Sequence, residues 1–542
     1  MNRFIHKTTQ FVFSKQKSMF SSALLLAFMI VISRLFGFLR YRILAGYFST
    51  EQLDIFFASF RIPDLVFELL ITGALTSSFI PIYIQYQNNK EDLRTNISSI
   101  INVICIVLIV CIIILLLFLD PLIYLITPGY SSTKINEIIT YSRFLLIGQL
   151  PFLVLGNILT GIGQANKIFL LSALAPIIYN LGIIISIVLF AGNLYLLAPV
   201  VGVILGASLF FVIQLPLLAK SDFNYSFILK RTEGLKKFVR ITIPRIVSVL
   251  VAQIDATVDL TLTTFLGAGS YTIFYFAQHF QLLPVSVIGI SFGQASLPYL
   301  SEIYQEGKME EFKRIIIDSI LNLFFLVIPI MSFFIFARTP LIRLFFGGEK
   351  FDWASTVQTA ITLSFFSLSI PAHTIYYFLT RCYYAFLDTK TPFFVGLASI
   401  LINTIISLFF IIILKLPVWS LAISFSISMT INSAVLFYLL YKKLGGMDLP
   451  FFFKESAKIC LAALLSAVFS YYLMKLLDGL VFDTTRTINV FFLITTISFV
   501  FVSLYAFLSW FLNVREMYLI TKLFIKAREY RNKIVELYTT YE

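Results

Sequence analysis

Long apolar stretches separated by short polar turns run along the whole sequence. They lie near residues 20–47, 53–86, 97–120, 136–161, 169–191, 195–219, 241–267, 271–303, 315–337, 354–380, 393–414, 418–441, 456–475 and 488–511. An α-helix needs roughly 20 apolar residues to cross the hydrocarbon core of a bilayer. Because each stretch reaches about that length, the pattern predicts an all-α membrane protein with about fourteen transmembrane helices.

The composition supports a membrane protein and excludes a soluble one. Hydrophobic residues make up 59% of the chain, charged residues only 13%, and the mean hydropathy is +0.92. Soluble domains carry roughly 25% charged residues. The net charge of +13 could suggest nucleic-acid binding, but the basic residues follow the membrane topology instead, and we expect no nucleic-acid partner.

Lysine and arginine are distributed unequally between alternate loops. If the N-terminus is cytoplasmic, most of them fall in cytoplasmic segments, including the 220–240 loop and the tail after Val514. The opposite side holds only Lys134, Arg338, Arg343, Lys350, Lys415, Lys475 and Arg486. This positive-inside bias predicts that both termini are cytoplasmic and favours an even number of helices.

The two halves of the chain resemble each other at an offset of about 220 residues. The stretch from Leu122 matches that from Leu341; Pro151 matches Pro371, and Asn180 matches Asn403. We interpret this as a duplication of a six-helix bundle, an arrangement found in transporters. The predicted segments are an interfacial N-terminus (1–19), an N-lobe (20–219), a basic linker (220–240), a C-lobe (241–445), two further helices (446–512) and a basic tail (513–542).

Other notable residues indicate packing rather than chemistry. Gly202 and Gly206 have the spacing of a small-residue helix-packing face. The cysteines and histidines are scattered without metal-ligand spacing. The sequence contains no phosphate-binding glycine loop, nucleophile elbow or metalloprotease helix, so it offers no catalytic residues, and we expect no enzyme activity.

The region 32–86 places ionisable side chains in two apolar stretches: Arg34, Arg40, Arg42, Asp54, Arg61 and Asp64. An arginine at the centre of a membrane helix costs about 2.5–3.5 kcal/mol on insertion scales. These arginines could therefore line an aqueous cavity for an anionic ligand, pair with the aspartates, or snorkel to the headgroups. Arg34 and Arg40 would lie about 120° apart on an ideal helix, so a shared face requires a bend, for which Gly37 is the candidate.

A second ionisable pair lies in the stretch 241–267. Asp255 and Asp259 are four residues apart and so share one helix face. The pair could bind a cation, hold a transferable proton, or serve as polar packing.

Several segments together resemble one transporter family. They are SRLFGFLR, LDIFFASFRIPDL, GALTSSFIP, GIGQANKIF, APIIYNLGIII, YFAQHFQLLPVSVIGISFGQASLP, FGGEKFD and YYAFLDTKTP. Their order and spacing, from about residue 20 to the end, resemble the MurJ (MviN) family of lipid II flippases, within the MATE-like (MOP) exporter superfamily. The chain is similar to a divergent member of that family.

The resemblance implies alternating-access transport of an undecaprenyl-diphosphate-linked peptidoglycan precursor from the inner to the outer leaflet of the bacterial inner membrane, for cell-wall synthesis. It implies a head-group cavity between the two lobes and a prenyl-tail groove at 446–512. Membrane lipids and the glycolipid are the expected partners, together with cell-wall synthesis proteins as candidates, and we expect a monomer.

By position, Arg34 and Arg40 match the arginines that line the family's cavity, and Asp54 matches its acid in the second helix. Arg42 and Arg61 are further candidates for substrate binding. Two departures affect the expected head group. Phe67 and Glu68 replace two basic residues, and His279, preceded by Gln278, replaces an arginine. We include His279 and Gln278 among the candidate substrate contacts.

Some members of the family bind sodium. The resemblance carries that site onto Asp259, Asn403 and Ser407, with Ser407 standing where the family has a second acid, and Asp255 lies one turn from Asp259. Sodium is therefore a candidate coupling ion, a proton-linked carboxylate is the alternative, and no other cofactor is expected.

Three other functions remain open at this point. A flippase for another prenyl-diphosphate-linked glycan, of O-antigen or capsule type, would accommodate the altered residues Phe67, Glu68 and His279. A MATE-type drug or cation antiporter would require an acidic cavity. A membrane scaffold would recruit partners through the basic tail 514–542.

Overall fold

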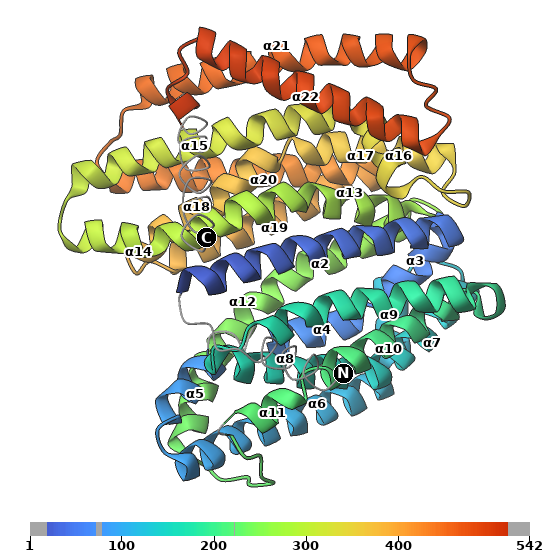
Figure 1. The fold of residues 1–542 in the computed structure, drawn as a ribbon, viewed down its shortest axis with the longest axis vertical. Coiled ribbons are helices and arrows are strands. Elements are labelled where there is room, and N and C mark those ends of the chain that lie inside the picture. Colours follow the sequence, from blue (N-terminus) through green and yellow to red (C-terminus); the bar gives the residue numbers. More distant parts are fainter. Residues whose placement is uncertain (1–18, 72–77, 222, 519–542) are drawn as a thin grey trace, which may run out of the picture. The chain divides into compact units, whose positions relative to one another are not determined.

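A computed structural model describes residues 19–71, 78–221 and 223–518 (Figure 1). Within these ranges every regular element is a helix, and the chain folds as two compact units. The first unit comprises residues 1–272 and 345–355, and the second comprises 273–344 and 356–542. The predicted interfacial N-terminus, apart from its last residue, and the part of the basic tail beyond residue 518 lie outside the described residues.

The first unit contains the helices α2 to α12. Their bounds are α2 (Met19–Tyr47), α3 (Thr50–Ser59), α4 (Arg61–Leu70), α5 (Ile80–Tyr86), α6 (Lys90–Ile126), α7 (Ser132–Gly148), α8 (Leu150–Ala165), α9 (Leu170–Leu194), α10 (Leu197–Val212), α11 (Pro216–Lys220) and α12 (Glu233–Thr264).

The second unit contains most of the remaining helices. They are α13 (Ser270–Pro284), the π-helix η2 (Val285–Ile290), α14 (Ser291–Gln305), α15 (Met309–Phe336), α16 (Arg338–Phe346), α17 (Trp353–Ser367), α18 (Ile370–Ala385), α19 (Lys390–Leu408), the π-helix η3 (Phe409–Ile413), α20 (Trp419–Lys443), α21 (Leu449–Leu480), α22 (Thr487–Phe511) and the 3₁₀ turn η4 (Arg515–Met517). The first turn of α13, the last residues of α16 and the first of α17 belong to the first unit.

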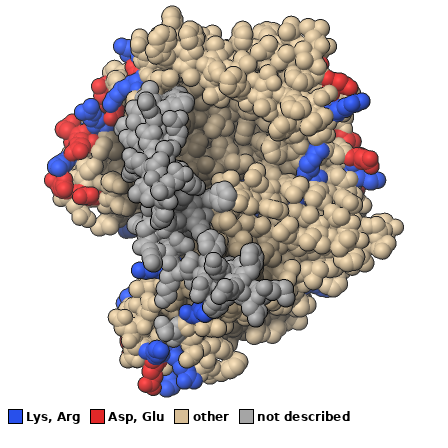
Figure 2. Space-filling model, in the orientation of Figure 1, with Lys and Arg blue, Asp and Glu red and all other residues tan. Residues whose placement is uncertain are grey.

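In the described part of the chain, 10 helical spans are long and apolar enough to cross a membrane. The other predicted spans are helical too: α2 carries interior arginines, α12 carries Asp255 and Asp259, and α17 and α18 are separate helices of 15 and 16 residues. In the second unit, charged side chains gather toward the two ends of the helices (Figure 2). The all-helical membrane fold is confirmed, whereas the count of fourteen stays a prediction.

The backbone supports the predicted duplication at the turns between helices. Lys167, after α8, and Leu387, after α18, are non-glycine residues with φ of 61° and 59°, and they lie 220 residues apart. Tyr195 and Lys415, with φ of 47° and 52°, also lie 220 residues apart. Left-handed backbone is rare outside glycine. Its recurrence at the same offset indicates that both halves turn the chain in the same way.

The helices α9 and α10 approach closely through small residues. A Cβ atom on Gly182 would lie 2.7 Å from the Cα atom of Gly206, and one on Gly202 would lie 2.7 Å from the Cβ atom of Ser186. Such distances exclude any side chain at these glycines. The prediction that Gly202 and Gly206 form a packing face is therefore confirmed.

The predicted linker has an unpredicted anchor. A row of buried polar side chains on α6 bonds the main chain of residues 226–234, and α12 follows directly. Consistent with this, α12 belongs to the first unit, although the sequence repeat assigns it to the second lobe. The lobe boundaries themselves stay a prediction.

The turn between α18 and α19 is closed by an ion pair. Asp388 accepts hydrogen bonds from the Thr391 amide at 3.1 Å and the Thr391 hydroxyl at 2.9 Å, and from Lys443 Nζ at 2.8 Å. Partial burial would raise the pKa of Asp388, but these bonds outweigh it and lower the pKa from 3.8 to about 2. The turn is therefore fixed to the end of α20.

We expect this ion pair to make stability depend on pH in acid. Because the folded-state pKa of Asp388 lies below the unfolded value, its contribution is complete above about pH 4 and is lost as the pH falls toward about 2. Asp388→Asn should remove up to about 2 kcal/mol at neutral pH, since solvent screens this partly exposed pair. Thermal unfolding in detergent between these pH values measures the effect.

Lys442→Gln is the matched control, because this neighbouring exposed lysine has no bond to Asp388. The Lys442→Gln variant should keep the acid dependence of the parent protein. An unchanged acid dependence in Asp388→Asn would contradict the assignment.

Candidate functional site

Helix α2 carries the arginines that the sequence assigns to substrate binding. The helix is unbroken through Gly37 (Figure 1), so Arg34 and Arg40 leave it in different directions. Arg34 is exposed, whereas Arg40 and Arg42 are half-buried. The guanidinium of Arg40 stacks over the Tyr41 ring at 4.6 Å. Of these arginines, Arg34 is the most accessible to a ligand.

Arg61 is bonded within the protein. It begins α4, is 9% exposed, and donates to α12 through three hydrogen bonds. Its Nε reaches the Thr257 hydroxyl at 3.0 Å, and one terminal nitrogen reaches both the carbonyl and the side-chain oxygen of Gln253 at 2.7 Å. Charge-assisted bonds of this kind offset the cost of burying a cation. Arg61 therefore joins α4 to α12.

Acidic side chains lie within electrostatic range of these arginines. Asp64, on α4, feels the charges of Arg61, Glu68 and Arg40, and Asp259, on α12, feels those of Asp255 and Arg61. Asp259 is buried and Asp255 half-buried. The first unit thus gathers the predicted ionisable residues of α2, α4 and α12 into one region of mixed charge.

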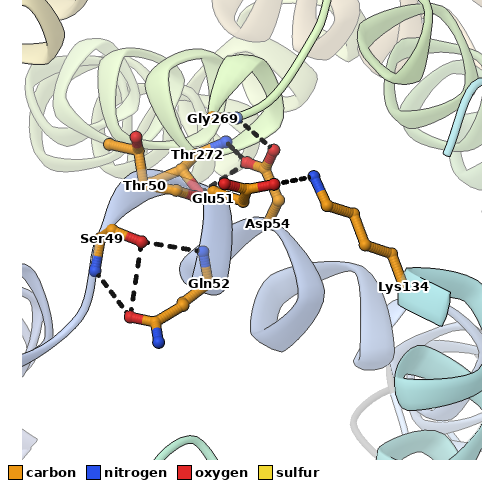
Figure 3. Close-up of polar contacts among 8 residues, drawn as sticks. All are labelled: Ser49, Thr50, Glu51, Gln52, Asp54, Lys134, Gly269 and Thr272. Carbon is orange, nitrogen blue, oxygen red and sulfur yellow. Dashed lines mark hydrogen bonds and ion pairs between the residues drawn. The ribbon is translucent and has the colours of Figure 1, made fainter. Parts of the chain in front are cut away.

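Asp54 has a structural role that the sequence did not reveal. It is fully buried on α3 and accepts hydrogen bonds from the Gly269 amide at 2.6 Å, the Thr272 amide at 2.7 Å and the Thr272 hydroxyl at 2.8 Å (Figure 3). These donors belong to the start of α13, where unpaired amides and the helix dipole favour a negative charge. The carboxylate therefore caps α13 from a different helix.

The sequence around Asp54 explains its position. Ser49 and Gln52 form a reciprocal capping box that begins α3, with the Ser49 amide bonded to Gln52 Oε1 at 3.0 Å (Figure 3). Glu51 forms an ion pair with Lys134 at the start of α7. Gly269 adopts a φ of 82°, which glycine tolerates without strain. The capping box was detectable in the sequence; the partners of Asp54, more than 200 residues away, were not.

The remaining predicted substrate residues, Gln278 and His279, lie on α13 in the second unit. Both are half-buried, and His279 Nδ1 lies 2.9 Å from the Tyr275 carbonyl one turn earlier. A nearby network was not predicted: Gln281 Nε2 donates to Ser369 Oγ at 3.0 Å and lies 3.4 Å from His373 Nδ1. Pairing between distant helices left no local signal for it.

The predicted ion ligands are divided between the two units. Asp255 and Asp259 lie in the first, and Asn403 and Ser407 lie on α19 in the second. Ser407 Oγ is 2.6 Å from Ser424 Oγ and joins α19 to α20. Among the described residues, no group of three or more histidine, cysteine, aspartate or glutamate side chains could hold a metal ion. The acid pair on α12 is therefore the part of this set that could accept a proton or a cation.

We expect Asp54→Asn to destabilise the protein. An asparagine can accept with one oxygen, but its amide group would face a backbone donor and leave a buried group unpaired. The expected cost is about 1–3 kcal/mol. Thermal or denaturant unfolding of the detergent-solubilised protein checks it.

Glu51→Gln is the control on the same helix, because the Glu51 side chain is 53% exposed and its ion pair with Lys134 should contribute at most about 1 kcal/mol. Equal losses in the two variants would contradict the capping role of Asp54.

Comparison with known proteins places this arrangement in a family. The profile of the family described as "Lipid II flippase MurJ" matches residues 44–481. A relative from Rickettsia prowazekii (strain Madrid E), named "Probable lipid II flippase MurJ", is 29% identical over 392 residues, which cover 71% of this chain and 77% of the relative.

Solved structures agree with the sequence comparison. The structure titled "Lipid II flippase MurJ, inward closed conformation" superposes with a TM-score of 0.73 at 25% identity and covers 90% of this chain and 99% of that one. An inward-facing multidrug resistance MATE transporter of the MOP superfamily matches with a TM-score of 0.65 at 14% identity, over 78% of this chain and 98% of its own, and shows the shared fold. The chain therefore belongs to the lipid II flippase MurJ family of multi-pass membrane proteins.

Proposed function

We propose that this protein flips an undecaprenyl-diphosphate-linked peptidoglycan precursor, lipid II, across the bacterial inner membrane by alternating access. The observation that carries the proposal is the family match over residues 44–481. The duplicated turns after α8 and α18 support it, since transporters of this kind are commonly built from internal repeats. The positive-inside bias supports cytoplasmic termini, with loading from that side.

The chemistry of α2 fits the diphosphate of such a substrate. Guanidinium groups present a planar, permanently charged set of donors that matches phosphate oxygens. Arg34 is exposed on a helix that is otherwise apolar, and Arg40 lies half-buried two turns further on. The family match begins at residue 44. The roles of Arg34 and Arg40 therefore rest on this chemistry and on the resemblance of SRLFGFLR to the family.

The prenyl chain requires an apolar path. The helices α21 and α22 pack against each other and expose apolar side chains, among them Leu464, Phe469, Phe499 and Val502. We propose that the tail lies along these helices while the polar head crosses.

The structural role of Asp54 and Arg61 narrows the candidate head-group contacts. Both side chains are occupied by protein donors or acceptors, which leaves Arg34 and Arg40, with Arg42, Gln278 and His279 as secondary candidates. Phe67 and Glu68 replace basic residues expected from the family. A related prenyl-diphosphate glycan is therefore the second candidate substrate, and native mass spectrometry of co-purified lipid would distinguish the two.

Arg34→Ala and Arg40→Ala should each reduce lipid II translocation in proteoliposomes by at least about tenfold. A lost charge-assisted hydrogen bond corresponds to about 1.5–3 kcal/mol, and 1.4 kcal/mol is a factor of ten. Lysine at the same positions should restore part of the rate, because it keeps the charge but loses the two-pronged contact. The same variants should fail to complement a strain that lacks its own lipid II flippase.

Arg143→Ala is the matched control for these substitutions. Arg143 is also an arginine of a membrane helix in the first unit, but its guanidinium bonds Asp120 at 2.6 Å. The rate of Arg143→Ala should stay close to that of the parent protein. Normal rates in the variants at Arg34 and Arg40 would remove the proposed head-group site, although not the family assignment.

We propose that the carboxylates on α12 couple transport to an ion. Asp259 is buried beside Asp255, and two neighbouring acids favour uptake of a positive charge, either sodium or a proton. Asp259→Asn should abolish the dependence of translocation on the coupling gradient, whereas Asp120→Asn, an exposed acid of the same unit, should leave it intact.

The coupling ion can be identified by imposing a sodium gradient and a proton gradient separately on proteoliposomes that contain the parent protein. The gradient that accelerates translocation names the ion. A parent protein insensitive to both gradients would contradict the coupling role of Asp259.

A further inference from the structure

The segment between α11 and α12 has an extended backbone held along one side. Ser226 donates its amide to Ser98 Oγ at 3.1 Å. Asn102 Nδ2 donates to the carbonyls of Ser226 at 3.1 Å and Ile228 at 2.9 Å. The Lys230 amide reaches Ser99 Oγ at 3.3 Å. The main chain of this segment is thus bonded to one face of α6.

The side chains on the other side of this segment are large and apolar. Successive side chains of an extended chain alternate between two sides. Tyr225, Phe227 and Leu229 are 41%, 93% and 61% exposed, whereas the intervening Ser226 and Ile228 are partly buried. The rings of Tyr225 and Phe227 meet edge to face at 5.2 Å. Residues 225–229 therefore present an ordered apolar edge that the first unit does not cover.

The position of this edge along α6 locates it relative to the bilayer. The 37 residues of α6 correspond to about 55 Å, longer than the hydrocarbon core of about 30 Å. The exposed apolar surface of α6 begins at Ile106 and continues to Leu117 and Phe118. Asn102, which holds the segment, lies one helical turn, about 6 Å, before Ile106. The edge therefore stands at the boundary between headgroups and hydrocarbon.

Basic side chains flank the apolar edge. Lys230 and Arg231 are exposed and directly follow Leu229, and Arg94 on α6 bonds Ser226 Oγ at 3.2 Å. Of the nearby acids, Glu233 is paired with Lys236 at 2.7 Å. Lys and Arg gather at the end of the first unit that carries α5 and the start of α6 (Figure 2). Aromatic residues beside lysine and arginine are typical of a membrane interface with anionic lipids.

We infer that the linker 223–232 is a membrane-surface anchor: Tyr225, Phe227 and Leu229 enter the bilayer interface, and Lys230 and Arg231 contact anionic headgroups. The bonds to α6 pre-order the backbone, so the apolar edge is presented without a further loss of chain entropy. This anchoring does not depend on the transported substrate.

Site-directed spin labelling of the full chain in vesicles of phosphatidylethanolamine and phosphatidylglycerol tests the anchor. The native cysteines are replaced, and a nitroxide is placed at residue 227, or at residue 224 as control, since Asn224 is an exposed polar residue of the same segment. The label at 227 should collide several-fold more with oxygen, which concentrates in the bilayer, and several-fold less with a water-soluble nickel chelate than the label at 224.

Equal access of the nickel chelate to both labels would overturn the inference and would mark the edge as a surface for a soluble protein. A second arm tests the charges. Replacing Lys230 and Arg231 by glutamine, or omitting phosphatidylglycerol, should raise nickel access at residue 227 at least twofold. No change in this arm would overturn the assignment of the two basic residues to anionic headgroups.

Discussion

The cost of keeping charge inside an apolar helical bundle shapes the first unit of this protein. A buried ion without partners is far too unfavourable to persist, so each buried charge must be bonded or reach water. Arg61 meets this requirement through Gln253 and Thr257, and Asp54 meets it through the first turn of α13. Both side chains hold together helices that are remote in sequence. Their conservation of charge therefore serves the fold before it serves any ligand.

This constraint separates the arginines into two kinds. Arg61 is 9% exposed and its printed bonds are all to α12, whereas Arg34 is exposed on α2. A guanidinium that the protein has already saturated cannot also neutralise a substrate. The exposed arginine, on a helix otherwise suited to lipid, retains that capacity. The arrangement thus divides the basic residues between holding helices together and interacting with an anionic head group.

Much of the architecture could be predicted from local patterns. Apolar length predicted membrane helices, the repeat predicted turns of the same geometry after α8 and α18, and Gly202 and Gly206 predicted close helix packing. Local patterns failed where partners are distant. The sequence placed Asp54 in the substrate site because its acceptors' donors, Gly269 and Thr272, are invisible from residue 54. The side chains of α6 that bind the linker resemble ordinary polar residues at a helix end.

The bonding of the linker to α6 also changes how the connection between the halves should be regarded. A loop rich in polar and basic residues suggests slack, yet its main chain is fixed at Ser226, Ile228, Lys230 and Gly234. It works as a strap rather than a tether, so a force applied to α12 is transmitted to α6 before it reaches α11. The freedom of such a connection is set by the few residues before its first bond and not by the length of the loop.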